Sequence, residues 1–467
     1  MKSPDFETRR PRAFEEPIIW DSSRAPRMWE KDGMQELHPA HRCAIFTVHG
    51  IGQQHWAETA AGLRAGFEDA LEEIYKWQEG ENAKAAKGES ARKDATLRTA
   101  ALPYDLNQIK KLPSPYIYEG YWADYADLKA TFPTECRDMS DKERDFFEQL
   151  WGKRPVSSSR TLIWFLRRQF SLLHPRNIPK VGAAYLLYIP LQIVATVTLF
   201  FAWLRRPAII KGFLADVRLY CDPQGEIEKA IVQRIDRRVG SEFLKMLNLD
   251  WEFRELPWPE RISRSGKLVD FNRIIWVAHS LGTVISYNVL SDLFLHAKNI
   301  KVNGDDEQIR GVDRLHDSLR RFVTLGSPLD KIAFLFGRKT LRPWPKEQRN
   351  GSDDEWWINF YHVLDPVSGV LSSDLISHND PPANFHIRSC WIPGLAHLAY
   401  WKDSRSLRFI LGRTYGAENL PDKDFNPWPD WKKNFLAILA YFVWLGFLLG
   451  ITAGFFFVVE MLIRTIF

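Results

Sequence analysis

Short apolar runs alternate with amphipathic stretches along much of this chain. The runs have the length of buried strands and occupy residues 43–48, 116–122, 274–277, 322–325, 357–364 and 385–392. In three stretches apolar residues recur every three or four positions, which predicts helices: Leu63, Phe67, Leu71 and Ile74; Ile227, Ile231, Ile235 and Val239; Val284, Tyr287, Leu290 and Leu293. This alternation predicts an α/β fold, in which a parallel sheet carries helices on both faces.

A longer apolar run near the C-terminus has the properties of a membrane helix. Residues 435–459 are long enough to cross a bilayer at about 1.5 Å per helical residue. Lys432 and Lys433 precede the run, so we predict a transmembrane helix within 431–464 whose lysine side faces the cytoplasm. Small residues at four-residue spacing favour close helix packing, within the chain or in a homo-oligomer: Gly446, Gly450 and Gly454.

A second long apolar run, 181–204, carries no charged residue and contains Pro190. The predicted sheet joins strands from both sides of this run, so both of its ends must lie on one side of a membrane. Basic residues flank both ends, which favours a cytoplasmic location: Arg167, Arg168, Arg176 and Lys180 before it; Arg205, Arg206 and Lys211 after it. We therefore predict a re-entrant or interfacial hairpin; a hidden second crossing and a buried pair of core helices are the alternatives.

These patterns divide the chain into four parts. Residues 1–40 are rich in proline, arginine and glutamate and are expected to form an irregular arm. The α/β domain is expected to comprise residues 41–140 and 222–415. A helical, membrane-associated insertion, 141–221, separates its two halves, and the membrane helix at 431–464 follows it.

The composition excludes several classes of protein. The formal net charge is only +5 and no long Lys/Arg block is present, so no nucleic-acid partner is expected; the mild basic excess suits an anionic membrane surface. The 19 tryptophans favour core anchors and membrane interfaces. The cysteines are far apart and form no CxxC pair, so no metal site or disulfide framework is expected: Cys43, Cys136, Cys221 and Cys390. No secretory signal is visible in the first forty residues.

The sequence Ala-His-Ser-Leu-Gly at 278–282 joins a predicted strand to a predicted helix. Ser280 has Ala278 two residues before it and Gly282 two residues after it, and His279 stands beside it. A sharp strand–serine–helix turn needs small residues at those two positions, because its strained backbone leaves no room for larger side chains. A serine in such a turn becomes a nucleophile when a base, an orienting acid and oxyanion donors are supplied.

Candidates for these groups lie at the ends of other predicted strands. Asp365 follows the run at 357–364, and His397 lies in a glycine-containing loop just past the run at 385–392. Asp330, after the run at 322–325, is the rival acid. The rival bases are His362, His378 and His386. His49 and Gly50 end the first strand, where a loop that carries oxyanion donors is expected.

With these motifs the chain resembles the α/β-hydrolases, and it is most similar to the lipase and esterase branch that carries a His-Gly oxyanion motif. The resemblance covers roughly residues 40–415, and it implies that Ser280 is the nucleophile, His397 the general base and acid, and Asp365 the orienting carboxylate. The chain order Ser, Asp, His is the order that this fold uses. The resemblance also implies an oxyanion hole made by the backbone N–H groups of Ile51 and Leu281. Ala278 departs from the motif, which has glycine there.

The expected function follows from combining this chemistry with the apolar runs. We expect a membrane-bound serine hydrolase that cleaves ester bonds of lipid or acyl substrates through an acyl-enzyme. Membrane lipids are the expected partners, and the expected location is the cell membrane, with the catalytic domain in the cytoplasm. Neither a cofactor nor a metal is implied. An acyltransferase with the same triad and an inactive membrane scaffold with the same fold are the alternatives.

Overall fold

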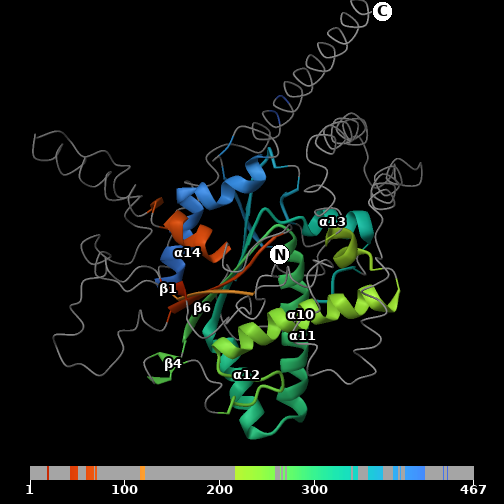
Figure 1. Cartoon of the computed structure of the whole chain (residues 1–467), viewed down its shortest axis with the longest axis vertical. Helices are drawn as coiled ribbons and strands as arrows, with labels where there is room; N and C mark the ends of the chain where they lie inside the picture. The colour runs from red at the N-terminus through yellow and green to blue at the C-terminus, as the bar shows by residue number, and fades with distance from the viewer. Residues whose placement is uncertain are drawn as a thin grey trace, which may run out of the picture.

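A computed structural model of the chain (Figure 1) describes most of the predicted strands and the helices around them. The described residues are 18–19, 43–50, 59–67, 69–70, 116–120, 216–223, 225–257, 263–264, 267–268, 271–337, 340–344, 356–365, 367–371, 382–387, 390, 395–415, 435 and 439.

A twisted sheet lies at the centre of this part of the chain. Seven strands are described in it, in the order β1-β3-β2-β6-β7-β8-β9. They are β1 (Ile18–Ile19), β2 (Cys43–Val48), β3 (Tyr116–Glu119), β6 (Arg273–His279), β7 (Leu319–Leu325), β8 (Trp357–Tyr361) and β9 (Ala383–His386). The six strands from β3 to β9 are parallel, and β1 pairs antiparallel with β3 at one edge. The short strands β4 (Ser263–Arg264) and β5 (Lys267–Leu268) form a separate antiparallel pair.

The central strand β6 shows why both faces of this sheet need cover. Ile274, Trp276 and Ala278 belong to one apolar core, and Ile275 and Val277 belong to the other. Successive residues of a strand point to opposite faces of the sheet. A run that is apolar at every position is therefore stable only with a helical layer on each side, as the sequence predicts.

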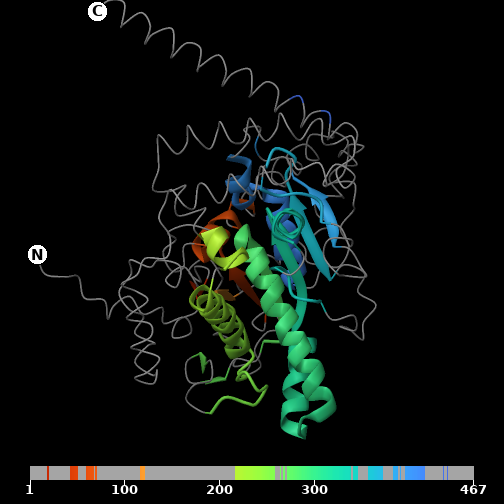
Figure 2. The ribbon, with the colours of Figure 1, turned by 90° about the vertical axis from the view of Figure 1, so that its right-hand side faces the viewer.

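Helices supply these two layers. On one face lie α10 (Glu226–Met246), α11 (Leu281–Asn303) and α12 (Asp306–Ser318), with α10 and α11 side by side (Figures 1 and 2). On the other face, α14 (Ser404–Tyr415) and the helical residues 59–67 bury Ile410 and Phe67 against the sheet. The result is the three-layer α/β arrangement that the alternation of strands and helices predicts.

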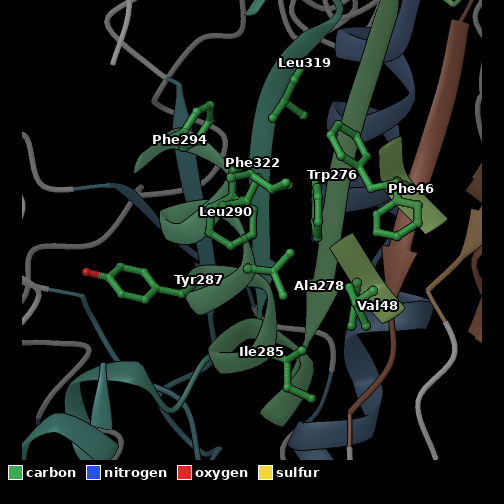
Figure 3. Packing of buried hydrophobic residues seen from close by; sticks show 14 of the residues in the cluster. Phe46, Val48, Trp276, Ala278, Ile285, Tyr287, Leu290, Phe294, Leu319 and Phe322 are labelled. Carbon is green, nitrogen blue, oxygen red and sulfur yellow. The ribbon is translucent and has the colours of Figure 1, made fainter. Parts of the chain in front are cut away.

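Trp276 fixes α11 against the middle of the sheet. Its ring lies edge-on to Phe46 with centroids 4.5 Å apart, and Figure 3 shows it between the side chains of β2 and those of α11 and β7. The buried indole N–H donates a hydrogen bond of 2.8 Å to Ser286 Oγ in α11. A buried indole needs such a partner, so this bond orients the helix that begins directly after Ser280.

The pairing of β2 with β6 joins the two separated halves of the predicted α/β domain in one sheet. β2 pairs with β6 along its whole length, from Cys43 opposite Arg273 to Val48 opposite Ala278. β8 ends at Tyr361, earlier than the apolar run, because residues 362–365 form a turn in which the Asp365 N–H donates to the His362 carbonyl at 3.0 Å. Leu219, Tyr220 and Cys221, placed by the sequence in the insertion, are buried in the core beside α10.

Both predicted membrane segments fall almost entirely outside the described residues. Of 181–204 nothing is described, and of 431–464 only Phe435 and Leu439, which are exposed and which precede the glycine series 446, 450 and 454. Within the ranges that the structure does describe, no helix is both long enough and apolar enough to cross a bilayer.

Candidate active site

Ser280 stands in a sharp turn between β6 and α11. Its backbone has φ 55° and ψ −131°, a conformation that costs a residue other than glycine of the order of 1–3 kcal/mol. Hydrogen bonds on both sides hold it there: Ser280 N–H donates to the Leu325 carbonyl at 3.0 Å, and Thr283 donates to the Ser280 carbonyl from its N–H at 2.9 Å and its hydroxyl at 2.7 Å. Strain maintained in this way is typical of functional sites.

The small residues around Ser280 are required by close contact with the end of β2. A methyl group on Gly282 would lie 2.2 Å from the His49 carbonyl oxygen, and one on Gly50 would lie 2.6 Å from Ser280 Cβ. The loop that begins with His49 and Gly50 therefore packs directly on the serine turn. Ala278, which replaces the glycine of the motif, is fully buried, so its methyl group is accommodated in the core.

The structure brings Ser280, His397 and Asp365 into one hydrogen-bonded series. His397 Nε2 is 2.8 Å from Ser280 Oγ, and His397 Nδ1 is 2.9 Å from Asp365 Oδ2. A carboxylate only accepts hydrogen bonds, so Nδ1 carries the proton and, in the neutral ring, Nε2 accepts the proton of the serine hydroxyl. This is the geometry that a serine nucleophile with a general base requires.

Asp365 is held as a carboxylate although it is buried. Burial by itself raises the pKa of this group, but other effects lower it well below its usual range. These are the charge and hydrogen bond of His397, the hydrogen bond from the Val367 N–H at 2.8 Å, and the charge of the nearby Lys331. Burial in turn lowers the pKa of Lys331 to about 8, against the opposing effect of Asp365. The carboxylate therefore stays charged at neutral pH and can stabilise a protonated His397.

The rival residues occupy other places. Asp330 lies in the first turn of α13 (Leu329–Phe336). His362 follows β8 and His386 ends β9, and their rings pack against each other with centroids 5.7 Å apart. His378 is outside the described residues. In the part of the chain that the structure describes, the hydrogen bond of Ser280 Oγ goes to His397.

His279 connects the serine turn to the loop that carries His397. Its Nε2 is 2.9 Å from the His397 carbonyl oxygen, which only accepts, so Nε2 donates; the two rings pack with centroids 4.8 Å apart. Burial, followed by the neighbouring His397, lowers the pKa of His279 to about 3, so the ring stays neutral. Burial likewise lowers the pKa of His49 to about 4, and His49 Nδ1 donates to the Gly50 carbonyl at 2.8 Å. Both histidines therefore act as neutral hydrogen-bond donors.

One of the two expected oxyanion donors is described. Leu281 is the first residue of α11, so its N–H has no carbonyl to bond within the helix. Ser280 occupies the N-cap position without a side-chain cap bond, which leaves the positive end of a 23-residue helix dipole directed at the serine. Ile51, the other expected donor, lies outside the described residues.

Several residues of this site were not predicted from the sequence. The Tyr400 hydroxyl donates to Asp365, and the Ser368 hydroxyl lies 2.8 Å from that of Tyr400. Ser327 Oγ lies 2.9 Å from Thr283 Oγ1. Ser327 follows β7 at a strand end, the same signal that indicated Asp365, so this contact was accessible to prediction. Across the described ranges, no cluster of three or more His, Cys, Asp or Glu side chains could hold a metal ion.

Comparison with known proteins identified no relative of this chain. No protein-family model, curated protein or solved structure gives a significant match to the chain.

Proposed function

We propose that the chain is a serine hydrolase of the α/β-hydrolase kind that cleaves esters through an acyl-enzyme. The observation that carries this proposal is the series Ser280–His397–Asp365, with distances of 2.8 and 2.9 Å, at a strained turn between a central parallel strand and a helix. A structural serine needs neither the strain nor a base that a buried carboxylate orients.

The proposed reaction has two halves. Ser280 Oγ attacks the ester carbonyl carbon while its proton passes to His397 Nε2, and the oxyanion forms at the N-terminus of α11 beside the Leu281 N–H. The intermediate then expels the alcohol, which takes the proton from His397. Water, activated by His397, attacks the acyl-enzyme, releases the carboxylic acid and restores Ser280. Asp365 stabilises the protonated ring in both halves.

Lipid or acyl esters are the proposed substrates, and membrane lipids the proposed partners. The uncharged run at 181–204 and the apolar run at 435–459 support attachment to a membrane. In the structure, Leu398 is 62% exposed directly after His397, and Val370 is 52% exposed in the loop that follows Asp365. Both residues lie within five positions of a triad residue in the sequence, and we propose that they contact the acyl chain of the substrate. The proposed location is the cytoplasmic face of the cell membrane.

The hydrolase proposal is tested by labelling with a fluorophosphonate probe. Wild type should be labelled, and Ser280→Ala should not. Ser291→Ala is the matched control, because it removes a buried hydroxyl of the same helix that bonds the Pro343 carbonyl, and it should be labelled like wild type. A folded wild type that resists the probe would favour the inactive scaffold instead.

The substrate proposal needs a separate measurement. Hydrolysis of p-nitrophenyl esters from acetyl to palmitoyl should show a rising kcat/KM with chain length, and a sharp preference for acetyl would contradict the lipid proposal. Transfer of the acyl group to an added alcohol in preference to water would identify an acyltransferase. Retention of the full chain in membranes after an alkaline carbonate wash would support attachment, and its release would oppose it.

A further inference from the structure

Tyr400 lies one 3-10 turn beyond His397, in η7 (Leu395–Lys402). Side chains three residues apart in a 3-10 helix lie on the same side, so Tyr400 reaches the same carboxylate. Its hydroxyl is 2.9 Å from Asp365 Oδ2, the oxygen that accepts the His397 Nδ1–H. Asp365 Oδ1 accepts the Val367 N–H. The tyrosine hydroxyl and the imidazole therefore share one oxygen of the orienting acid.

Counting protons gives the direction of each hydrogen bond around Tyr400. An ionised carboxylate only accepts, so the single O–H of Tyr400 points at Asp365. The contact of 2.8 Å between Tyr400 and the Ser368 hydroxyl must then use the serine proton, whose other acceptor, the His362 carbonyl, is farther away at 3.5 Å. Ser368 thus donates to Tyr400, and Tyr400 donates to Asp365, so the bonds polarise one another in the same direction. Lys331 Nζ donates to the backbone carbonyl of Ser368 at 2.7 Å, which holds the serine in position.

The position of the Tyr400 ring is set by the end of β7. The side chain is fully buried, and a methyl group on Gly326, which has φ +62°, would lie 2.8 Å from Tyr400 Cε2. The ring therefore occupies the space that a side chain at position 326 would need. Burial, followed by the charge of Asp365, raises the pKa of the phenol well above its ordinary value, so the hydroxyl remains a donor.

We propose that Tyr400, whose oxygen accepts a hydrogen bond from Ser368, is a positioning residue that limits the basicity of Asp365 towards His397. This inference rests on the proposed hydrolase function. The hydroxyl withdraws electron density from the shared oxygen and fixes the plane of the carboxylate. Without it, more negative charge faces His397, the protonated ring is stabilised, and His397 is lost as a base at a higher pH.

Other charged and titratable groups around this pair limit the pH range of a test. Asp365 also faces Lys331 and His362, and His397 also faces His279. Burial lowers the pKa of His279 to about 3, and it also lowers that of His362. Since the pKa of Lys331 is about 8, a titration that stops at pH 7.5 leaves most of its charge in place.

The decisive variant is Tyr400→Phe. The rate constant for fluorophosphonate labelling of Ser280, measured from pH 5 to 7.5, should fall on the acid side in wild type. In Tyr400→Phe the midpoint of this fall should move up by about 0.5–1 pH unit, which is an extra loss of roughly 3–10-fold at pH 5 relative to the plateau. A midpoint equal to that of wild type overturns the proposal.

Two further variants separate the proposal from simple destabilisation. Ser368→Ala keeps the tyrosine ring and should move the midpoint in the same direction by less, which remains a test even if Tyr400→Phe does not fold. Tyr287→Phe removes a buried hydroxyl that has no hydrogen-bond partner within the described chain, and it should leave the midpoint unchanged; an equal shift would refute the proposal. Labelling of wild type without a shift refutes the role of Tyr400 alone, whereas a folded wild type that is not labelled refutes the hydrolase function and this role together.

Discussion

Gly282 and His49 are in such close contact that no side chain fits between them. A methyl group on Gly282 would lie 2.2 Å from the His49 carbonyl oxygen and 2.6 Å from that of Val48. Both obstacles are backbone atoms at the end of a central strand, so neither can rotate away. This contact sets the distance between the start of α11 and the loop that carries Gly50.

Gly282→Ala should therefore disrupt the site as well as the fold. Overpacking of this kind costs about 1–3 kcal/mol or more, and the start of α11 must move away from β2. We expect a lower midpoint of thermal unfolding and strongly reduced fluorophosphonate labelling. Gly62→Ala is the matched control, because among the described residues no atom beyond its own helix backbone lies within 4 Å of the added methyl group; in a helix this change should add about 0.5–1 kcal/mol to stability. Equal stability of the two variants would contradict the contact.

Asp365→Asn should slow labelling and ester hydrolysis by roughly 10³–10⁴-fold. The amide cannot hold the protonated ring of His397 and can present its NH₂ group to Nδ1, which favours the wrong tautomer. Asp330→Asn tests the rival acid and should leave the rate within about twofold, because Asp330 lies in α13 and not at His397. Loss of activity in Asp330→Asn with retention in Asp365→Asn would reverse the assignment.

Replacement of His279 should show whether its hydrogen bond positions His397. His279→Leu removes the donor to the His397 carbonyl, and a small displacement of the base should slow labelling by roughly 10–100-fold. His279→Gln can place an N–H at the same point and should recover most of the rate. Because the pKa of His279 is about 3, the ratio of variant to wild-type rates should be constant from pH 5 to 8; a ratio that changes with pH would indicate a titrating role.

Asp236 should make the stability of the fold depend on pH. It accepts hydrogen bonds from Tyr220 and Arg342, each at 2.5 Å, yet burial raises its pKa to about 6 against the lowering effect of Arg342. Between about pH 4 and 6 the folded state then binds a proton that the unfolded state has released. The resulting stabilisation is complete below the unfolded pKa and is lost as the pH rises through 6.

The measurement is chemical unfolding of wild type and Asp236→Asn from pH 4 to 7. The unfolding free energy of wild type relative to the variant should fall by about 3 kcal/mol across this range. A difference that is flat, or that rises with pH, would show that Asp236 is ionised throughout.

The centre of the sheet was predictable because β2 and β6 are apolar at most of their successive positions. The run at 43–48 coincides with β2, and the run at 274–277 lies within β6. The helix α12 was missed although a signal existed: Asp305 and Gln308 form a capping box, which stands three residues apart in the sequence. The helix has only 13 residues and few apolar residues on its buried face, so hydrophobic spacing alone did not reveal it.

The site was predictable only as far as strand ends indicate it. Asp365 and His397 follow strands, and the carboxyl ends of parallel strands meet at one edge of the sheet. Tyr400, Ser368 and Lys331 come from a 3-10 turn, a loop and a short helix whose contacts depend on how those segments cross. The sequence does not show how these segments cross one another, so the side chains around Asp365 could be identified only from the structure.

The pairing of β2 with β6 also determines when the protein can assemble. Roughly 230 residues separate Cys43 from its partner Arg273, a contact distant enough to make folding slow. At about 5–20 residues per second of synthesis, the first strands wait roughly 10–50 seconds for the central one. During that interval β2 can pair with β3 on one side but lacks β6 on the other. Newly made chains should therefore be most prone to aggregation, and most dependent on chaperones, before β6 emerges from the ribosome.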